Sequence, residues 1–141
     1  MDRGNIVRVW LPLLFASMML GFVFASMPGP RDAMRWVGLG LGVAGLSGVL
    51  FARYTLGRSF SIRAKATELV TRGVYSRIRN PIYVFGIVFA VGLFLMVRKP
   101  YLWLVLPLFV GLQIIRARQE ARVLEAKFGD AYREYRERTW F

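Results

Sequence analysis

The sequence of 141 residues contains neither cysteine nor histidine. Without cysteine, the chain can form no disulfide, no thiolate zinc site and no cysteine nucleophile. Without histidine, it lacks the commonest general base and the commonest metal ligand. Any chemistry on this chain must therefore use carboxylates, arginines, tyrosines, backbone groups or a bound cofactor, and we expect no metal site.

Acidic residues are scarce, with 8 Asp and Glu against 20 Lys and Arg, although 56% of the residues are hydrophobic. The apolar residues gather in four long blocks, and the charges are concentrated between them. A helix that crosses the hydrocarbon core of a bilayer needs about 20 apolar residues. The pattern predicts an all-α integral membrane protein with four transmembrane helices, at about residues 7–27, 34–52, 81–97 and 101–116.

The distribution of basic residues predicts the orientation of these spans. Two basic residues lie at the N-terminal end, seven between the second and third blocks and seven after the fourth. The two other turns share Arg31, Arg35, Arg98 and Lys99. The positive-inside rule then places both termini and the segments 53–80 and 117–141 in the cytoplasm. We expect a single domain over residues 1–141 in a bacterial inner membrane, and no nucleic-acid partner.

Gly40–Gly45 matches the dinucleotide-binding pattern G-x-G-x-x-G. That pattern binds a cofactor only between a strand and a helix of a βαβ unit, whereas here it lies inside an apolar block. Small residues at this spacing let transmembrane helices approach closely. We therefore interpret Gly38 and Gly42, with Gly45 and Gly48 nearby, as a helix-packing surface.

The middle segment contains two turn signals, Gly57 and Gly73, and ends at Asn80-Pro81. The residue before a proline is disfavoured in helical geometry, and proline suits the first turn of a helix. The third span should therefore begin at Pro81, with its free backbone N–H groups at the membrane surface. Such a terminus favours an anionic ligand, although it is also an ordinary helix start.

The tail predicts a helix that continues from the fourth span, ends at Gly129 and is followed by a short helix capped by Asp130. Arg116 and Glu120 are four residues apart and share a helix face, either as a surface pair or as part of a polar site at the end of the span. The tail also has an apolar stripe, which comprises Leu124, Phe128, Tyr132 and Tyr135. We expect this stripe to pack on the loop or to lie in the membrane interface.

Three blocks in these segments resemble, in order and spacing, the membrane methyltransferases that include isoprenylcysteine carboxyl methyltransferase and the phospholipid N-methyltransferases. The first block is Leu56–Ser61. The second is Glu68–Tyr75, which continues through Arg79–Tyr83 to Gly86. The third block comprises Arg116, Glu120, Leu124, Phe128, Gly129, Tyr132 and Tyr135.

The resemblance implies a pocket for S-adenosyl-L-methionine, with S-adenosyl-L-homocysteine as product, built from the cytoplasmic loop and the C-terminal helices. The cofactor residues that it implies are Thr67, Glu68, Leu69, Val70, Tyr75, Asn80, Pro81, Ile82, Tyr83 and Glu120. Arg116 and Glu120 are the implied catalytic residues, and Arg116 faces the substrate. The chain departs from the family pattern at Asn80, where the family has His, and at Ala121, where a second Glu is frequent.

Methyl transfer from a sulfonium mainly requires alignment of nucleophile, methyl group and sulfur. A carboxylate acceptor needs no general base, whereas an amine must lose a proton. We therefore expect a methyltransferase that acts at the membrane–cytoplasm interface on a lipid-like or prenylated substrate, foremost the carboxylate of an isoprenylcysteine. The acceptor would reach the site sideways, between the third and fourth spans. The alternative within the family is the amine of an ethanolamine phospholipid.

A non-catalytic membrane scaffold or a small transporter subunit is the alternative of another class. A transporter would carry an ionisable group within a span, and the central parts of the four blocks contain no acidic or basic residue. A scaffold would not need the Asn80–Tyr83 turn together with Arg116 and Glu120. Cofactor binding separates the scaffold from the enzyme, and the sequence does not determine the oligomeric state.

Overall fold

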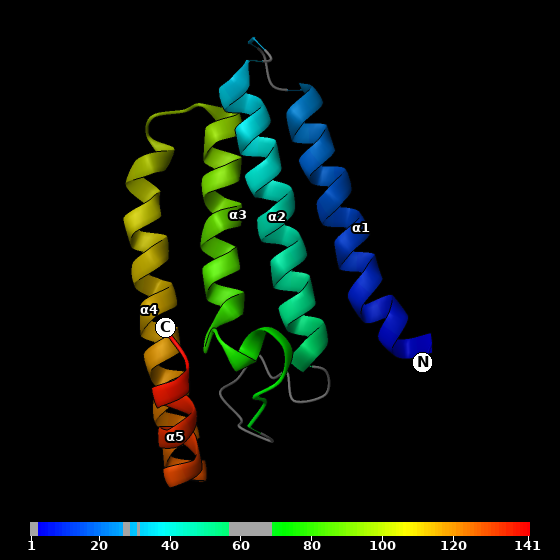
Figure 1. Cartoon of the computed structure of the whole chain (residues 1–141). Helices are drawn as coiled ribbons and strands as arrows, with labels where there is room; N and C mark the ends of the chain where they lie inside the picture. Colours follow the sequence, from blue (N-terminus) through cyan, green and yellow to red (C-terminus); the bar gives the residue numbers. More distant parts are fainter. Residues whose placement is uncertain (1–2, 27–28, 31, 57–68) are drawn as a thin grey trace.

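The computed structural model of the chain describes residues 3–26, 29–30, 32–56 and 69–141, with the backbone alone for residues 3–13 and 15. Each of the four apolar blocks forms one long helix in these residues (Figure 1). The elements are α1 (Arg3–Ser26), α2 (Ala33–Leu56), the short 3-10 helix η2 (Gly73–Ser76), α3 (Pro81–Val97), α4 (Leu102–Phe128) and α5 (Asp130–Arg138). The expectation of an all-α chain is therefore confirmed over the described residues.

Glycines bring the backbones of α2 and α3 into direct contact. A Cβ atom placed on Gly45 would lie 2.4 Å from the backbone nitrogen of Phe89, and one on Gly38 would lie 2.8 Å from the carbonyl oxygen of Gly92. Gly42 faces Leu20 of α1 on another side, whereas a Cβ on Gly40 would meet nothing within 4 Å. The helix-packing interpretation of this pattern is confirmed, and Gly40 takes no part in it.

Two of the described helices, α2 and α4, are long and apolar enough to cross a membrane. The apolar α3 has 17 residues, and the corresponding part of α1 is Ala16–Ser26. At about 1.5 Å per residue, α3 falls a little short of a typical hydrocarbon core. Crossing by all four helices remains a prediction from the sequence.

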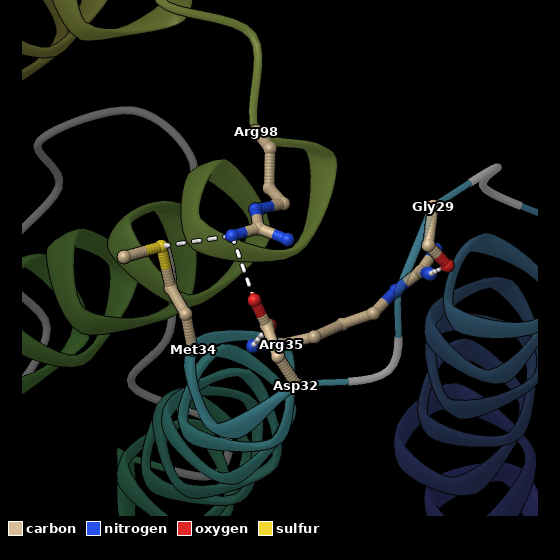
Figure 2. A network of polar contacts seen from close by, with 5 residues as sticks. All are labelled: Gly29, Asp32, Met34, Arg35 and Arg98. Carbon is tan, nitrogen blue, oxygen red and sulfur yellow. Dashed lines mark hydrogen bonds and ion pairs between the residues drawn. The ribbon is translucent and has the colours of Figure 1, made fainter.

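The turns before α2 and before α4 are joined by a polar network at the end of the bundle away from α5 (Figures 1 and 2). Asp32 accepts a hydrogen bond from the backbone N–H of Arg35 at 3.2 Å and pairs with Arg98 at 2.8 Å. The Arg35 guanidinium donates to the carbonyl of Gly29 and is 2% exposed. Arg35, counted above as a turn residue, therefore lies in the first turn of α2 and fastens the chain between α1 and α2.

At the opposite end, α4 continues past its apolar part and α5 folds back beside it (Figure 1). Gly129 separates the two helices with a φ of 50°, a value that glycine adopts without strain. The predicted break at Gly129 is confirmed. The predicted cap at Asp130 is wrong by one residue: Gly129 is the N-cap, and the Asp130 carboxylate pairs with Arg133 instead.

Candidate functional site

Helix α3 and the polar extension of α4 meet in a hydrogen bond between side chains 37 residues apart. The hydroxyl of Tyr83, in the first turn of α3, donates to Oε2 of Glu120 at 3.1 Å. Glu120 lies four residues beyond the span predicted at 101–116, so its carboxylate stands at the end of that apolar stretch. The second and third motif blocks therefore come together at one point.

Burial is the main influence on Glu120. Removal from water raises the pKa of its carboxyl above the ordinary value, and the hydrogen bond from Tyr83 opposes that shift in part. Arg116 is exposed and forms no ion pair with Glu120 or with another described residue. Arg116 and Glu120 therefore do not form the surface pair that was one interpretation of this helix face. The structure instead has a half-buried carboxylate at Glu120 and an exposed guanidinium at Arg116.

The turn into α3 begins as expected, with Pro81 at the first helical position and Asn80 as N-cap. Its free N–H groups are fewer than expected. Pro81 has no N–H, the amides of Tyr83 and Val84 donate to the carbonyl of Asn80, and the amide of Asn80 itself is occupied. Among the described residues of this turn, Ile82 is the one whose backbone N–H donates to no backbone carbonyl. An anion would therefore meet one donor here.

Several of the expected cofactor residues pack against each other. Val70 and Tyr75 form a buried apolar cluster with Ala52 of α2, and Ile82 packs against it. Burial raises the pKa of the Tyr75 hydroxyl, and the nearby Glu120 carboxylate adds to that shift. Leu69 is partly buried next to Val70. This cluster attaches the loop to the end of α2 and supports the turn that carries Asn80 and Tyr83.

Tyr132 and Tyr135 of α5 also belong to this region. The Tyr135 hydroxyl donates to the backbone carbonyl of Tyr75 at 2.7 Å, and burial raises the pKa of Tyr135 to about 12. Tyr132 is 1% exposed, and its hydroxyl has no hydrogen-bond partner among the described residues. The apolar stripe indicated packing on the loop or a position in the membrane interface, and for Tyr135 the hydrogen bond to Tyr75 supports packing on the loop. The stripe gave no sign of the two hydroxyl groups.

A half-buried carboxylate and a buried hydroxyl without a partner fit a ligand that combines positive charge with hydrogen-bonding groups. S-adenosylmethionine has both a sulfonium and many polar atoms, so the donor set is compatible with it. Thr67 and Glu68, also expected in the pocket, lie outside the described residues, as do Gly57 and most of the Leu56–Ser61 block.

Comparison with known families gives a match that covers most of the chain. The family model described as phospholipid methyltransferase matches residues 33–131, from the first turn of α2 to the start of α5. No curated protein matches the chain. The matched range includes Tyr83, Glu120 and Arg116, together with the two helices that are long enough to cross a membrane.

Proposed function

The chain belongs to the phospholipid methyltransferase family, and from this membership we propose that it transfers a methyl group from S-adenosylmethionine to a lipid-like acceptor at the cytoplasmic surface of the membrane. The observation that carries the proposal is the hydrogen bond between Tyr83 and Glu120, because it unites the two motif blocks at the end of the apolar helices. Membership itself makes the chain a methyltransferase of a membrane family.

The proposed roles follow from the surroundings of each side chain. The Glu120 carboxylate, oriented by Tyr83, attracts the positive charge of the cofactor. The buried hydroxyl of Tyr132 is available for a polar group of the same ligand. The cofactor supplies an electrophilic methyl group, and the residues that remain, Asn80 to Ile82 and the cluster around Tyr75, shape its pocket.

The acceptor is proposed to be the amine of an ethanolamine phospholipid. The family description concerns phospholipids. An ammonium group must lose a proton before it attacks, and a carboxylate with a raised pKa is a stronger base than an ordinary one. Glu120 is therefore proposed as the base that accepts this proton, and its carboxylate attracts the charge of the cofactor only until it is protonated.

The carboxylate of an isoprenylcysteine, which the sequence favoured, is the second candidate. The exposed guanidinium of Arg116, without an ion pair among the described residues, supports it because arginine binds carboxylates bidentately. The same guanidinium would also bind the phosphate of a phospholipid, so Arg116 contacts the acceptor under either proposal.

The remaining proposals concern placement in the cell. We propose four spans, cytoplasmic termini and a single domain over residues 1–141 in the inner membrane of a bacterium. The distribution of basic residues supports this orientation. It puts Glu120 and Arg116 on the side where a charged, water-soluble cofactor is made available.

Binding of S-adenosylmethionine, which carries the sulfonium charge that S-adenosylhomocysteine lacks, to the detergent-purified protein, measured by calorimetry, tests the cofactor proposal. We expect saturable binding that Glu120→Ala weakens at least about tenfold, since a hydrogen-bonded charge contributes about 1.5–3 kcal/mol. Glu137→Ala on α5 is the matched control, because Glu137 is exposed and forms no ion pair among the described residues. Absence of binding by folded wild-type protein would reject the proposal and favour the scaffold.

Transfer of a labelled methyl group in vesicles distinguishes the acceptors. One set of vesicles contains phosphatidylethanolamine, and another contains a farnesylcysteine in phosphatidylcholine. We expect label in the first, with a higher KM for the acceptor in Arg116→Ala than in the control Arg118→Ala. Label in the second alone would replace the amine by the carboxylate, and an unchanged KM in Arg116→Ala would exclude contact between Arg116 and the acceptor.

A further inference from the structure

The last two residues of the chain pair through their backbones with the turn that leads into α3. The amide of Trp140 donates to the carbonyl of Arg77 at 3.1 Å, and the amide of Arg79 donates back to the carbonyl of Trp140 at 3.2 Å. These two bonds make a parallel bridge between Ile78 and Trp140. A third bond, at 2.9 Å, runs from the amide of Asn80 to the carbonyl of Phe141.

Helix α5 brings these residues to the turn. It begins after Gly129, folds back beside the end of α4 and carries the chain towards the start of α3 (Figure 1). Tyr135 fixes α5 to the same loop a few residues earlier, through its hydroxyl and the carbonyl of Tyr75. The segment from Tyr75 to Asn80 is therefore held at both ends by α5 and by the residues that follow it.

We propose that Trp140 and Phe141 form a backbone latch that positions the turn Arg77–Asn80 for the cofactor. The inference rests on the proposed function, in which Asn80 to Tyr83 contact S-adenosylmethionine, and it adds positioning residues that lie beyond the family match at 33–131. The latch acts through backbone atoms, so it leaves no recognisable residue pattern.

The geometry of the turn explains why it needs a latch. Arg77 and Asn80 have irregular backbone angles, with φ and ψ of −122° and −37° and of −124° and 58°, so no helix or strand fixes them. The latch supplies partners to the amides of Arg79 and Asn80 and to the carbonyl of Arg77. It also withdraws those two amides from any ligand, which leaves Ile82 as the backbone donor of the first turn.

Two substitutions at one position separate the backbone of the latch from its side chain. Trp140→Pro removes the amide that donates to Arg77, and Thr139 already has the extended angles, φ −122° and ψ 147°, that a following proline requires. Trp140→Ala keeps the amide and removes an indole that is 60% exposed. Deletion of residues 140–141 removes all three bonds and serves as a second variant should Trp140→Pro fold poorly.

Each protein is assayed in detergent for its Kd for S-adenosylhomocysteine and for its KM for S-adenosylmethionine and kcat. We expect Trp140→Pro to raise Kd and KM about tenfold, the equivalent of about one lost hydrogen bond, and the deletion, which removes all three bonds, to raise them at least as much. At saturating cofactor, kcat should stay within about twofold, and Trp140→Ala should bind within about twofold of wild type. A merely structural role would instead lower kcat through loss of folded protein and leave Kd unchanged.

Three results would overturn the latch: wild-type affinity in both Trp140→Pro and the deletion, equal weakening in Trp140→Ala, or a lower kcat with unchanged Kd. Each of these presupposes that the wild type binds S-adenosylhomocysteine, so the proposed function would survive them. Absence of binding by the wild type would overturn the proposed function and the latch together.

Discussion

The two faces of α3 differ in how they meet their neighbours. Towards α2, backbone touches backbone: a Cβ on Gly92 would lie 2.4 Å from the nitrogen of Gly42. Towards α4, the corresponding contact is made by the end of a side chain, since a Cβ on Gly86 would meet only the amide nitrogen of Gln113, at 3.4 Å. Buried residues of α2 include Gly38, Gly42 and Gly45, whereas Ala117 is the single buried residue of α4 in the described chain.

We call the side of α3 that packs on α2 the tight face and the side towards α4 the loose face. The tight face holds the helices together, and the loose face carries the candidate site. In a bilayer, helices associate by close packing of small residues, so the α2–α3 face is the one that holds the bundle together. The α3–α4 face is joined near its two ends, by Tyr83 with Glu120 and by the edge-to-face rings of Phe94 and Trp103. Between those contacts the α3–α4 face is the more loosely packed of the two, and we propose that a lipid acceptor approaches the site along it.

The largest expected effect comes from a methyl group on the tight face. Gly45→Ala would force its Cβ against the backbone of Phe85 and Phe89, which cannot move without separating the helices. We expect a loss of about 3 kcal/mol in the free energy of unfolding, at the upper end of overpacking costs. Thermal unfolding in detergent, followed by circular dichroism, measures this loss.

Gly40→Ala is the matched control, because it adds the same methyl group to the same helix where nothing lies within 4 Å. Its stability should equal or slightly exceed that of wild type, since alanine favours a helix over glycine by about 1 kcal/mol. Equal stabilities of Gly45→Ala and Gly40→Ala would show that the backbone contact at Gly45 does not govern the packing of α2, and the comparison between the two faces would fail.

The packing role of these glycines could be read from sequence because spacing alone places them on one side of a helix. The break at Gly129 and the start at Pro81 could be predicted for a similar reason, since each residue has a local conformational preference. Gly40 lies two residues from both Gly38 and Gly42, and therefore on the other side of the helix. The spacing could not predict that α3 is the helix whose backbone packs against Gly45.

The second expected effect concerns access along the loose face. Gly86→Leu would place an isobutyl group towards Gln113, between α3 and α4, without approaching α2. We expect the KM for a lipid acceptor in vesicles to rise about tenfold, equivalent to about 1.4 kcal/mol, while the Kd for S-adenosylhomocysteine is retained. Gly86→Ala is the control, because its Cβ makes only an ordinary contact. Unchanged acceptor kinetics in Gly86→Leu would place the lipid path elsewhere.

The candidate site shows where prediction from sequence stops. The motif blocks placed Tyr83 and Glu120 in one site, yet the hydrogen bond between them depends on how α3 and α4 pack. Arg116 and Glu120 share a helix face, but the partner of Glu120 comes from another helix. The contribution of Trp140 could not be predicted, because backbone pairing in an isolated bridge carries no side-chain pattern.

The smallest expected effect concerns the single side-chain hydrogen bond that joins the loose face near the site. Tyr83→Phe removes the donor to Glu120 and should cost about 1 kcal/mol in stability. It should also raise the pKa of Glu120 further, because the lost hydrogen bond favoured the ionised carboxylate. Cofactor binding that needs this negative charge should therefore fall, as the pH is lowered, at a higher pH in Tyr83→Phe than in wild type.

The direction of the pKa shift of Glu120 distinguishes loss of its negative charge from loss of folded protein as the cause of weaker binding in acid. Because burial raises the pKa of Glu120 in the folded chain, the folded state binds its proton more readily than the unfolded state does. Protonation of Glu120 therefore stabilises the fold, and that contribution is lost as the pH rises through the raised pKa. Weaker binding of S-adenosylmethionine in acid, with stability maintained, would identify the lost carboxylate charge as the cause. Identical pH profiles for wild type and Tyr83→Phe would mean that the hydrogen bond does not lower the pKa of Glu120.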